Sequence, residues 1–109
     1  MKRATATSLA ELEMAGEPIP RVGDFNIVTD WNGVAQCIIR TTHVEVVSFG
    51  DVTAEFAARE GEGDGSLAYW RRVHRAYYER VLSGTDHAVT EALLLACESF
   101  EVVYPHRPT

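Results

Sequence analysis

The sequence predicts an α+β domain with a small mixed or antiparallel sheet or a partial barrel. Segments rich in Val, Ile, Thr and Phe gather in the first half and at the end of the chain, while helical spacing of apolar residues is confined to the middle. The order is therefore strands, two helices and a strand, without the regular strand and helix alternation of a parallel sheet. A length of 109 residues suits one domain with a single core.

The clearest pair of strands covers residues 25–31 and 34–49, on either side of Asn32-Gly33. Asn-Gly is the strongest short signal for a two-residue hairpin turn. Because the second arm is long for one regular strand, we expect a bend or bulge near Thr41 and Thr42.

The two ends of the chain also favour strands. Residues 3–9 are small and threonine-rich, and a single helical turn is expected directly after them, over residues 10–14. Apolar residues return over 93–104, before Pro105 ends the last strand. These segments complete the sheet of the expected fold.

Two helices meet at an acidic, glycine-rich joint, the segment FAAREGEGDGSLAYW of residues 56–70. We predict that Gly61 ends the first helix and that Asp64 or Ser66 caps the second. The alternative is a functional bend, in which three glycines hold the carboxylates of Glu60, Glu62 and Asp64 close together.

Composition excludes several classes of protein. With 46% hydrophobic and 24% charged residues the chain is globular. A net charge of −6 argues against a protein that coats nucleic acid through its overall charge, but it allows a local basic groove.

No apolar run is long enough to cross a membrane and no signal peptide is evident, so a cytoplasmic location is expected. Cys37 and Cys97 are interpreted as small core residues. The histidines lack metal-ligand spacing and no phosphate-loop or dinucleotide motif is present, so we predict neither a metal site nor a cofactor.

The longer helix interleaves arginines with aromatic residues, a combination that can hold phosphates and stack on unpaired bases. The simpler interpretation is that the aromatic residues are core and the arginines form a solvated face. The candidate RNA-binding residues on this helix are Trp70, Arg71, His74 and Arg75.

The N-terminus offers a second candidate, the segment KRAT with Lys2 and Thr5. A lysine with a lowered pKa can deprotonate a neighbouring hydroxyl, and a carboxylate from elsewhere can then manage the proton of the leaving group. In a straight strand residues three apart face opposite sides, so these two side chains converge only where the backbone turns or bulges. The alternative is a frayed basic terminus.

Six segments together resemble the ASCH domain family over nearly the whole chain: KRATATSL (2–9), PRVGD (20–24), CIIRTT (37–42), FGDV (49–52), FAAREGEGDGSLAYW (56–70) and CESFEVVY (97–104). The resemblance implies a PUA-like fold, a small mixed β-barrel with two helices packed at its side and a cleft for RNA or nucleosides. Residues 1–109 would form one such domain, and we expect it to lack the N-terminal helical segment that relatives carry.

The function of such a domain has three alternatives. A ribonuclease would use Lys2 and the arginines to stabilise phosphorane charge, with Glu60 or His74 as base. An amidohydrolase of acetylated cytidine would use a K-x-x-T motif and a glutamate that match Lys2 as activator, Thr5 as nucleophile and Glu60 as proton shuttle, with Arg40 or the helix arginines meeting phosphate. The third alternative is an RNA-binding or interaction module without chemistry, which could form a strand-paired homodimer through an exposed edge.

Overall fold

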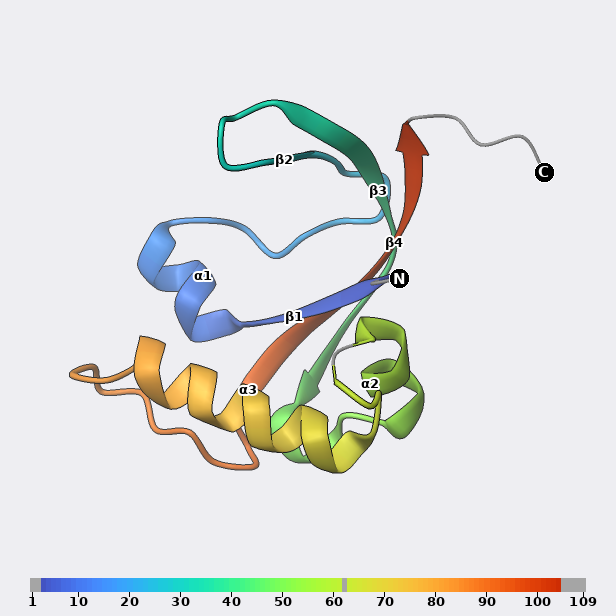
Figure 1. Cartoon of the computed structure of the whole chain (residues 1–109). Coiled ribbons are helices and arrows are strands. Elements are labelled where there is room, and N and C mark those ends of the chain that lie inside the picture. The colour runs from blue at the N-terminus through green and yellow to red at the C-terminus, as the bar shows by residue number, and fades with distance from the viewer. Residues whose placement is uncertain (1–2, 62, 105–109) are drawn as a thin grey trace.

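The computed structural model describes residues 3–61 and 63–104, which form a curled four-stranded antiparallel sheet with helices at its side (Figure 1). The elements in chain order are β1 (Ala4–Ser8), α1 (Leu9–Ala15), β2 (Phe25–Thr29), β3 (Ala35–Ser48), the 3-10 turn η1 (Phe49–Asp51), α2 (Ala54–Glu60), α3 (Leu67–Val81) and β4 (Leu94–Tyr104). The strand order is β1-β4-β3-β2, so β1 and β2 are the edges. The predicted α+β, PUA-like class is confirmed, with α1 as a third helix.

The hairpin between β2 and β3 forms where Asn32-Gly33 predicts it. The carboxylate of Asp30 accepts hydrogen bonds from the backbone N–H of Asn32 (2.9 Å) and Val34 (3.0 Å), and Gly33 takes a left-handed φ of 78°. The pairing of β3 with β4 shifts register between Thr41 and His43, which confirms the predicted bend. This bend lets the long strand curl.

The β2 end of the sheet stands apart from the core. Every residue of β2 is exposed, and large apolar side chains such as Phe25, Ile27 and Trp31 contact solvent. Because β2 is also an edge strand, its backbone can accept a further strand. The homodimer expected at an exposed edge stays a prediction.

The core lies between the sheet and the helices α2 and α3. Trp70 and Tyr78 of α3 pack around Phe49, whose ring meets that of Tyr78 edge to face at 6.2 Å. The β4 residues Leu95 and Cys97 contribute to this core, and burial raises the pKa of the Cys97 thiol to about 12. Cys97 is thus a core side chain, as predicted.

The glycine-rich joint is built as helix punctuation. Gly61 adopts a φ of 68° after the last residue of α2, and the Ser66 hydroxyl accepts a hydrogen bond from the N–H of Tyr69 at 3.1 Å. Asp64 in turn accepts from the N–H of Ser66, and the hydrogen bonds with Ser66 lower the pKa of the Asp64 carboxyl. Of the three carboxylates in the alternative, Glu60 is buried and Asp64 is exposed, while Glu62 lies outside the described residues, so a functional bend stays untested.

Candidate functional site

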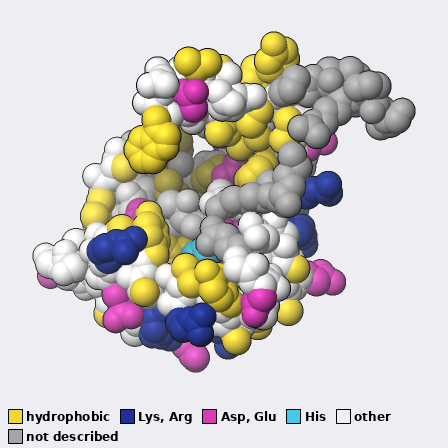
Figure 2. Space-filling view, in the orientation of Figure 1, with side chains coloured by type: hydrophobic (Ala, Val, Ile, Leu, Met, Phe, Trp, Pro, Cys, Tyr) yellow, Lys and Arg dark blue, Asp and Glu magenta, His cyan; other side chains and the backbone are white. Residues whose placement is uncertain are grey.

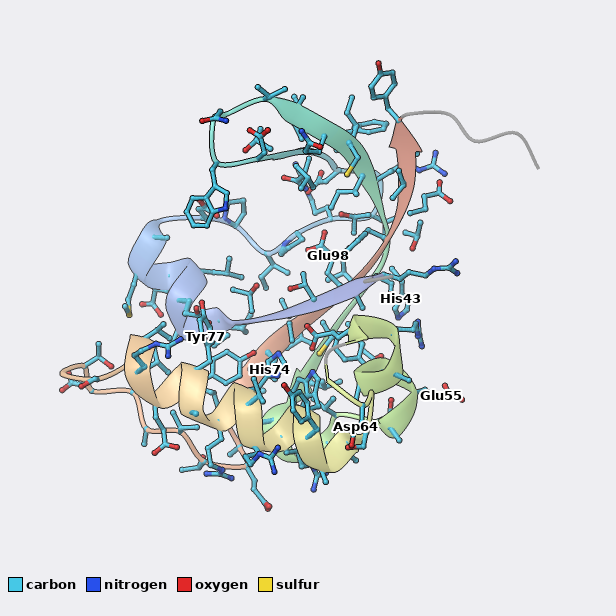
Figure 3. All side chains as sticks on the ribbon, in the orientation of Figure 1. His43, Glu55, Asp64, His74, Tyr77 and Glu98 are labelled. Atoms are coloured by element: carbon cyan, nitrogen blue, oxygen red, sulfur yellow. The ribbon has the colours of Figure 1, made fainter. Side chains whose placement is uncertain are left out.

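A cavity of about 520 Å³ lies between the edge strand β1 and the helix α3. Its polar lining comes from β1, α1, α2 and α3, and includes Thr5, Glu11, Glu60, His74, Tyr77 and Arg80. Figure 3 shows His74 and Tyr77 on the side of α3 that faces β1. Four elements therefore contribute chemically active groups to one open cavity.

Glu60 is the most buried charged residue of the site, with 1% of its surface exposed. It ends α2, and the turn at Gly61 redirects the chain directly after it. The indole N–H of Trp70 donates a hydrogen bond to Glu60 Oε2, and His74 Nε2 lies 3.2 Å from the same oxygen. These contacts hold the carboxylate against the wall of the cavity.

His74 is held by two further contacts with Trp70, one turn earlier on α3. Its Nδ1 lies 3.0 Å from the Trp70 carbonyl oxygen, and the two rings stack with centroids 4.1 Å apart. Because a carbonyl oxygen only accepts hydrogen bonds, this contact is favourable when Nδ1 carries a proton. Nε2 is then the ring nitrogen that faces Glu60. A carboxylate and an imidazole in this arrangement can take up and release a proton beside the cavity.

Glu11 connects the start of α1 to α3. One of its carboxylate oxygens accepts from the backbone N–H (3.0 Å) and hydroxyl (2.7 Å) of Ser8, which completes a capping box. The other oxygen accepts a hydrogen bond of 3.1 Å from the Tyr77 hydroxyl. Burial, with the neighbouring charge of Glu11, raises the pKa of Tyr77. Tyr77 is thus kept protonated as a donor at the cavity.

Arg80 supplies positive charge to the cavity. Its guanidinium lies 5.5 Å from the centroid of the Tyr77 ring, a cation–π contact that leaves the N–H donors open to a ligand. Val73, Ala76, Tyr77 and Arg80 follow the helical period, which places them on one face of α3. This face turns toward β1.

The structure brings three of the predicted site residues together. Thr5, Glu60 and His74 all line the cavity between β1 and α3. Trp70 does not line it but contacts both of the latter residues from the core. Lys2 lies outside the described residues, so its predicted role as activator stays a prediction.

The predicted arginines lie elsewhere. Arg71 donates to the carbonyl of Gly50 at 3.0 Å, and Arg75 lies over the ring of Phe49, so both contact the η1 region and neither lines the cavity. Arg40 on β3 forms an ion pair with Glu101 on β4, also away from the cavity. The predicted contacts of Arg40, Arg71 and Arg75 with RNA stay a prediction.

Sequence reasoning missed Glu11, Tyr77 and Arg80 as parts of the site. A local signal existed for Glu11, since Ser8 followed three residues later by Glu is the pattern of a capping box. Tyr77 was predicted as part of an apolar helical face, and Arg80 was one of several arginines on α3. Arg80 differs from the other arginines of α3 because it lies on the face of the helix that turns toward β1.

The surface around the cavity is mixed in charge. Figure 2 shows Lys and Arg side chains scattered among Asp and Glu on this face of the molecule. Among the residues that the structure describes, the basic side chains on this face do not form one continuous patch, so their binding of an anion would depend on the cavity itself.

Two negative findings apply to the residues that the structure describes. Within 3–61 and 63–104, no three His, Cys, Asp or Glu side chains converge where they could hold a metal ion. Over the same residues, no helix is both long and apolar enough to span a membrane.

A curled antiparallel sheet, with a polar cavity between its edge strand and a long helix, defines a small domain suited to binding a polar ligand. The chain belongs to the ASCH domain family, which it matches over residues 1–104. No curated protein matches it.

Two solved structures share the fold. The crystal structure of an ASCH domain from Lactobacillus crispatus JV V101 is 39% identical over 93% of this chain, with a TM-score of 0.84. That of a protein from Enterococcus faecalis V583 is 35% identical over 94%, with a TM-score of 0.81. The chain spans 64% and 61% of those two chains, respectively.

Proposed function

We propose that this ASCH domain binds RNA or a nucleoside in the cavity between β1 and α3 and hydrolyses RNA there, as a ribonuclease. The observation that supports the proposal is the contact of His74 with Glu60 at 3.2 Å, in a cavity that Arg80 also lines. A proton-exchanging pair beside a fixed positive charge is what phosphodiester cleavage needs.

In this reaction a hydroxyl group attacks the phosphorus atom and the bond to the leaving oxygen breaks. The pair of His74 and Glu60 takes the proton of the attacking hydroxyl and returns a proton to the leaving oxygen, so the protons balance. Arg80 stabilises the additional negative charge on the phosphoryl oxygens. Lys2, as predicted from the sequence, would help Arg80 to stabilise this negative charge.

A second candidate is the hydrolysis of the acetyl amide of acetylated cytidine, which the shared position of Thr5 and Glu60 in one cavity favours. The Thr5 hydroxyl, activated by Lys2, would attack the acetyl carbonyl, and Glu60 would pass the proton to the departing amine as the C–N bond breaks. Water would then release acetate from Thr5.

One experiment tests both candidates and the module without chemistry. The protein is incubated with mixed single-stranded RNA and, separately, with acetylated cytidine, and products are identified by mass spectrometry. Glu60→Gln, which keeps the size of the side chain, should abolish product formation, whereas Glu79→Gln on the exposed side of α3 should not. RNA fragments indicate the ribonuclease and loss of an acetyl mass indicates the amidohydrolase. Intact substrates in every sample refute both hydrolase proposals and leave a binding module.

We also propose that such a module forms a homodimer. The exposed apolar residues of the edge strand β2, Phe25 and Ile27 among them, support this proposal. Light scattering after size-exclusion chromatography should give twice the mass of one chain for the wild type. The double variant with Phe25→Lys and Ile27→Lys should give the mass of one chain. A monomeric wild type at high concentration contradicts the dimer.

A further inference from the structure

A second cavity of about 410 Å³ lies on the opposite side of β1, within the curl of the sheet. Its lining includes Thr5, Thr7, Asn26, Ile39 and Phe100, together with three acidic residues, Glu17, Asp24 and Glu98. Thr5 and Thr7 line both cavities, so the two cavities meet at the edge strand β1. In Figure 3, Glu98 lies on the β2–β3 side of β1, while His74 and Tyr77 lie on the α3 side.

Glu98 is the notable group of this second cavity. It lies directly opposite Thr5 in the pairing of β1 with β4, and only 8% of its surface is exposed. Thr41, itself 1% exposed, donates its hydroxyl hydrogen to Glu98 Oε2. Its neighbour Cys97 faces the core instead, because successive strand residues point to opposite faces.

A buried carboxylate in a cavity is a costly feature for stability alone, because the charge loses hydration that one hydroxyl replaces only in part. It is also a group that only accepts hydrogen bonds when ionised. Ile39 and Phe100 supply apolar surface in the same cavity. The cavity therefore suits a flat, partly apolar ligand that presents hydrogen-bond donors.

We propose that this second cavity receives the base of the bound RNA or nucleoside and that Glu98 accepts a hydrogen bond from the exocyclic amino group of that base. The inference rests on the proposed RNA binding, since it needs the ribose and phosphate to lie on the other side of β1, near Arg80. Carboxylates accept from the amino group of cytosine, and unpaired bases are read through this edge while apolar side chains cover their faces. Uracil, which has a carbonyl in place of that amino group, is the disfavoured base.

The test compares two labelled single-stranded RNAs of equal length, oligocytidylate and oligouridylate, by fluorescence anisotropy at one salt concentration. Cytosine and uracil have the same size, and they differ in this amino group and at N3, which carries a hydrogen only in uracil. The wild type should bind the cytosine oligomer about tenfold more tightly, the effect of one well-placed base contact. Glu98→Gln should remove this preference, because its amide can donate to the uracil carbonyl. Glu45→Gln, the same change at an exposed position of β3, should leave the preference unchanged.

The outcomes separate this inference from the function on which it rests. Equal affinity of the wild type for both oligomers overturns the base pocket but leaves RNA binding in place. A preference that survives in a folded Glu98→Gln overturns the role of Glu98. If circular dichroism shows that Glu98→Gln is unfolded, the comparison of the two oligomers with the wild type tests the base pocket by itself. No binding of either oligomer overturns both the proposed function and this inference.

Discussion

Replacing Glu60 by alanine should destabilise the domain strongly. The carboxylate accepts the indole N–H of Trp70 and contacts His74, and both partners are buried. An unsatisfied buried donor costs about 1–3 kcal/mol. Loss of the buried methylene costs about 0.8 kcal/mol more. The free energy of unfolding should therefore fall by about 3 kcal/mol, which lowers the melting temperature by roughly 12 °C in a domain of this size.

Urea denaturation followed by tryptophan fluorescence measures this change. Glu60→Gln keeps an oxygen acceptor for Trp70 and should cost only about 1 kcal/mol, the net value of a typical hydrogen bond. Glu79→Ala, at an exposed position of α3, should stay within about 0.5 kcal/mol of the wild type. If Glu60→Ala costs no more than Glu79→Ala, the contacts assigned to Glu60 do not hold the site together.

Two further predictions concern the joint and the core. Gly63→Ala should lower the free energy of unfolding by about 3 kcal/mol or more, because φ is 59° and an added Cβ would lie 2.4 Å from the Tyr69 ring. Gly65→Ala, with φ of 75° and open space around it, should cost about 1 kcal/mol, and equal losses in the two variants would contradict the packing of Gly63. Burial raises the pKa of Tyr78, whose hydroxyl donates to the Ala6 carbonyl, well above its usual range. Its stabilising contribution is thus complete below about pH 10, the pKa in the unfolded chain, and is lost as the pH rises further, by about 1.4 kcal/mol per pH unit. Denaturation between pH 9 and 11 should show a shallower decline in Tyr78→Phe than in the wild type, and parallel declines would refute this assignment.

Local signals were sufficient for much of the fold. The turn at Asn32-Gly33, the end of α2 at Gly61 and the cap of α3 at Ser66 each depend on residues within a few positions of one another. Backbone conformation at such positions follows from steric limits and short-range hydrogen bonds, which a sequence displays directly. The resemblance to ASCH domains added the curled sheet.

Which residues come together in the site depends on long-range packing, which local signals do not display. Glu60 was identified from the family motif and His74 from its residue type. No local sequence signal, however, shows that β1 lies beside α3. Without that placement, Arg71 and Arg75 are as plausible as Arg80, since all three alternate with aromatic residues on one helix. The pairing of Thr5 with Glu98 likewise joins the two ends of the chain.

The most direct test of the account is the affinity for single-stranded RNA, measured against salt concentration, in the wild type, Arg80→Ala and Arg72→Ala. Arg80 lines the cavity between β1 and α3, whereas Arg72 is exposed and does not. We expect Arg80→Ala to weaken binding about tenfold and to reduce the salt slope by about 0.7, the value of one phosphate contact on a single strand. Arg72→Ala should bind as the wild type does. Equal losses in the two variants, or unchanged binding in Arg80→Ala, would contradict an RNA site in this cavity.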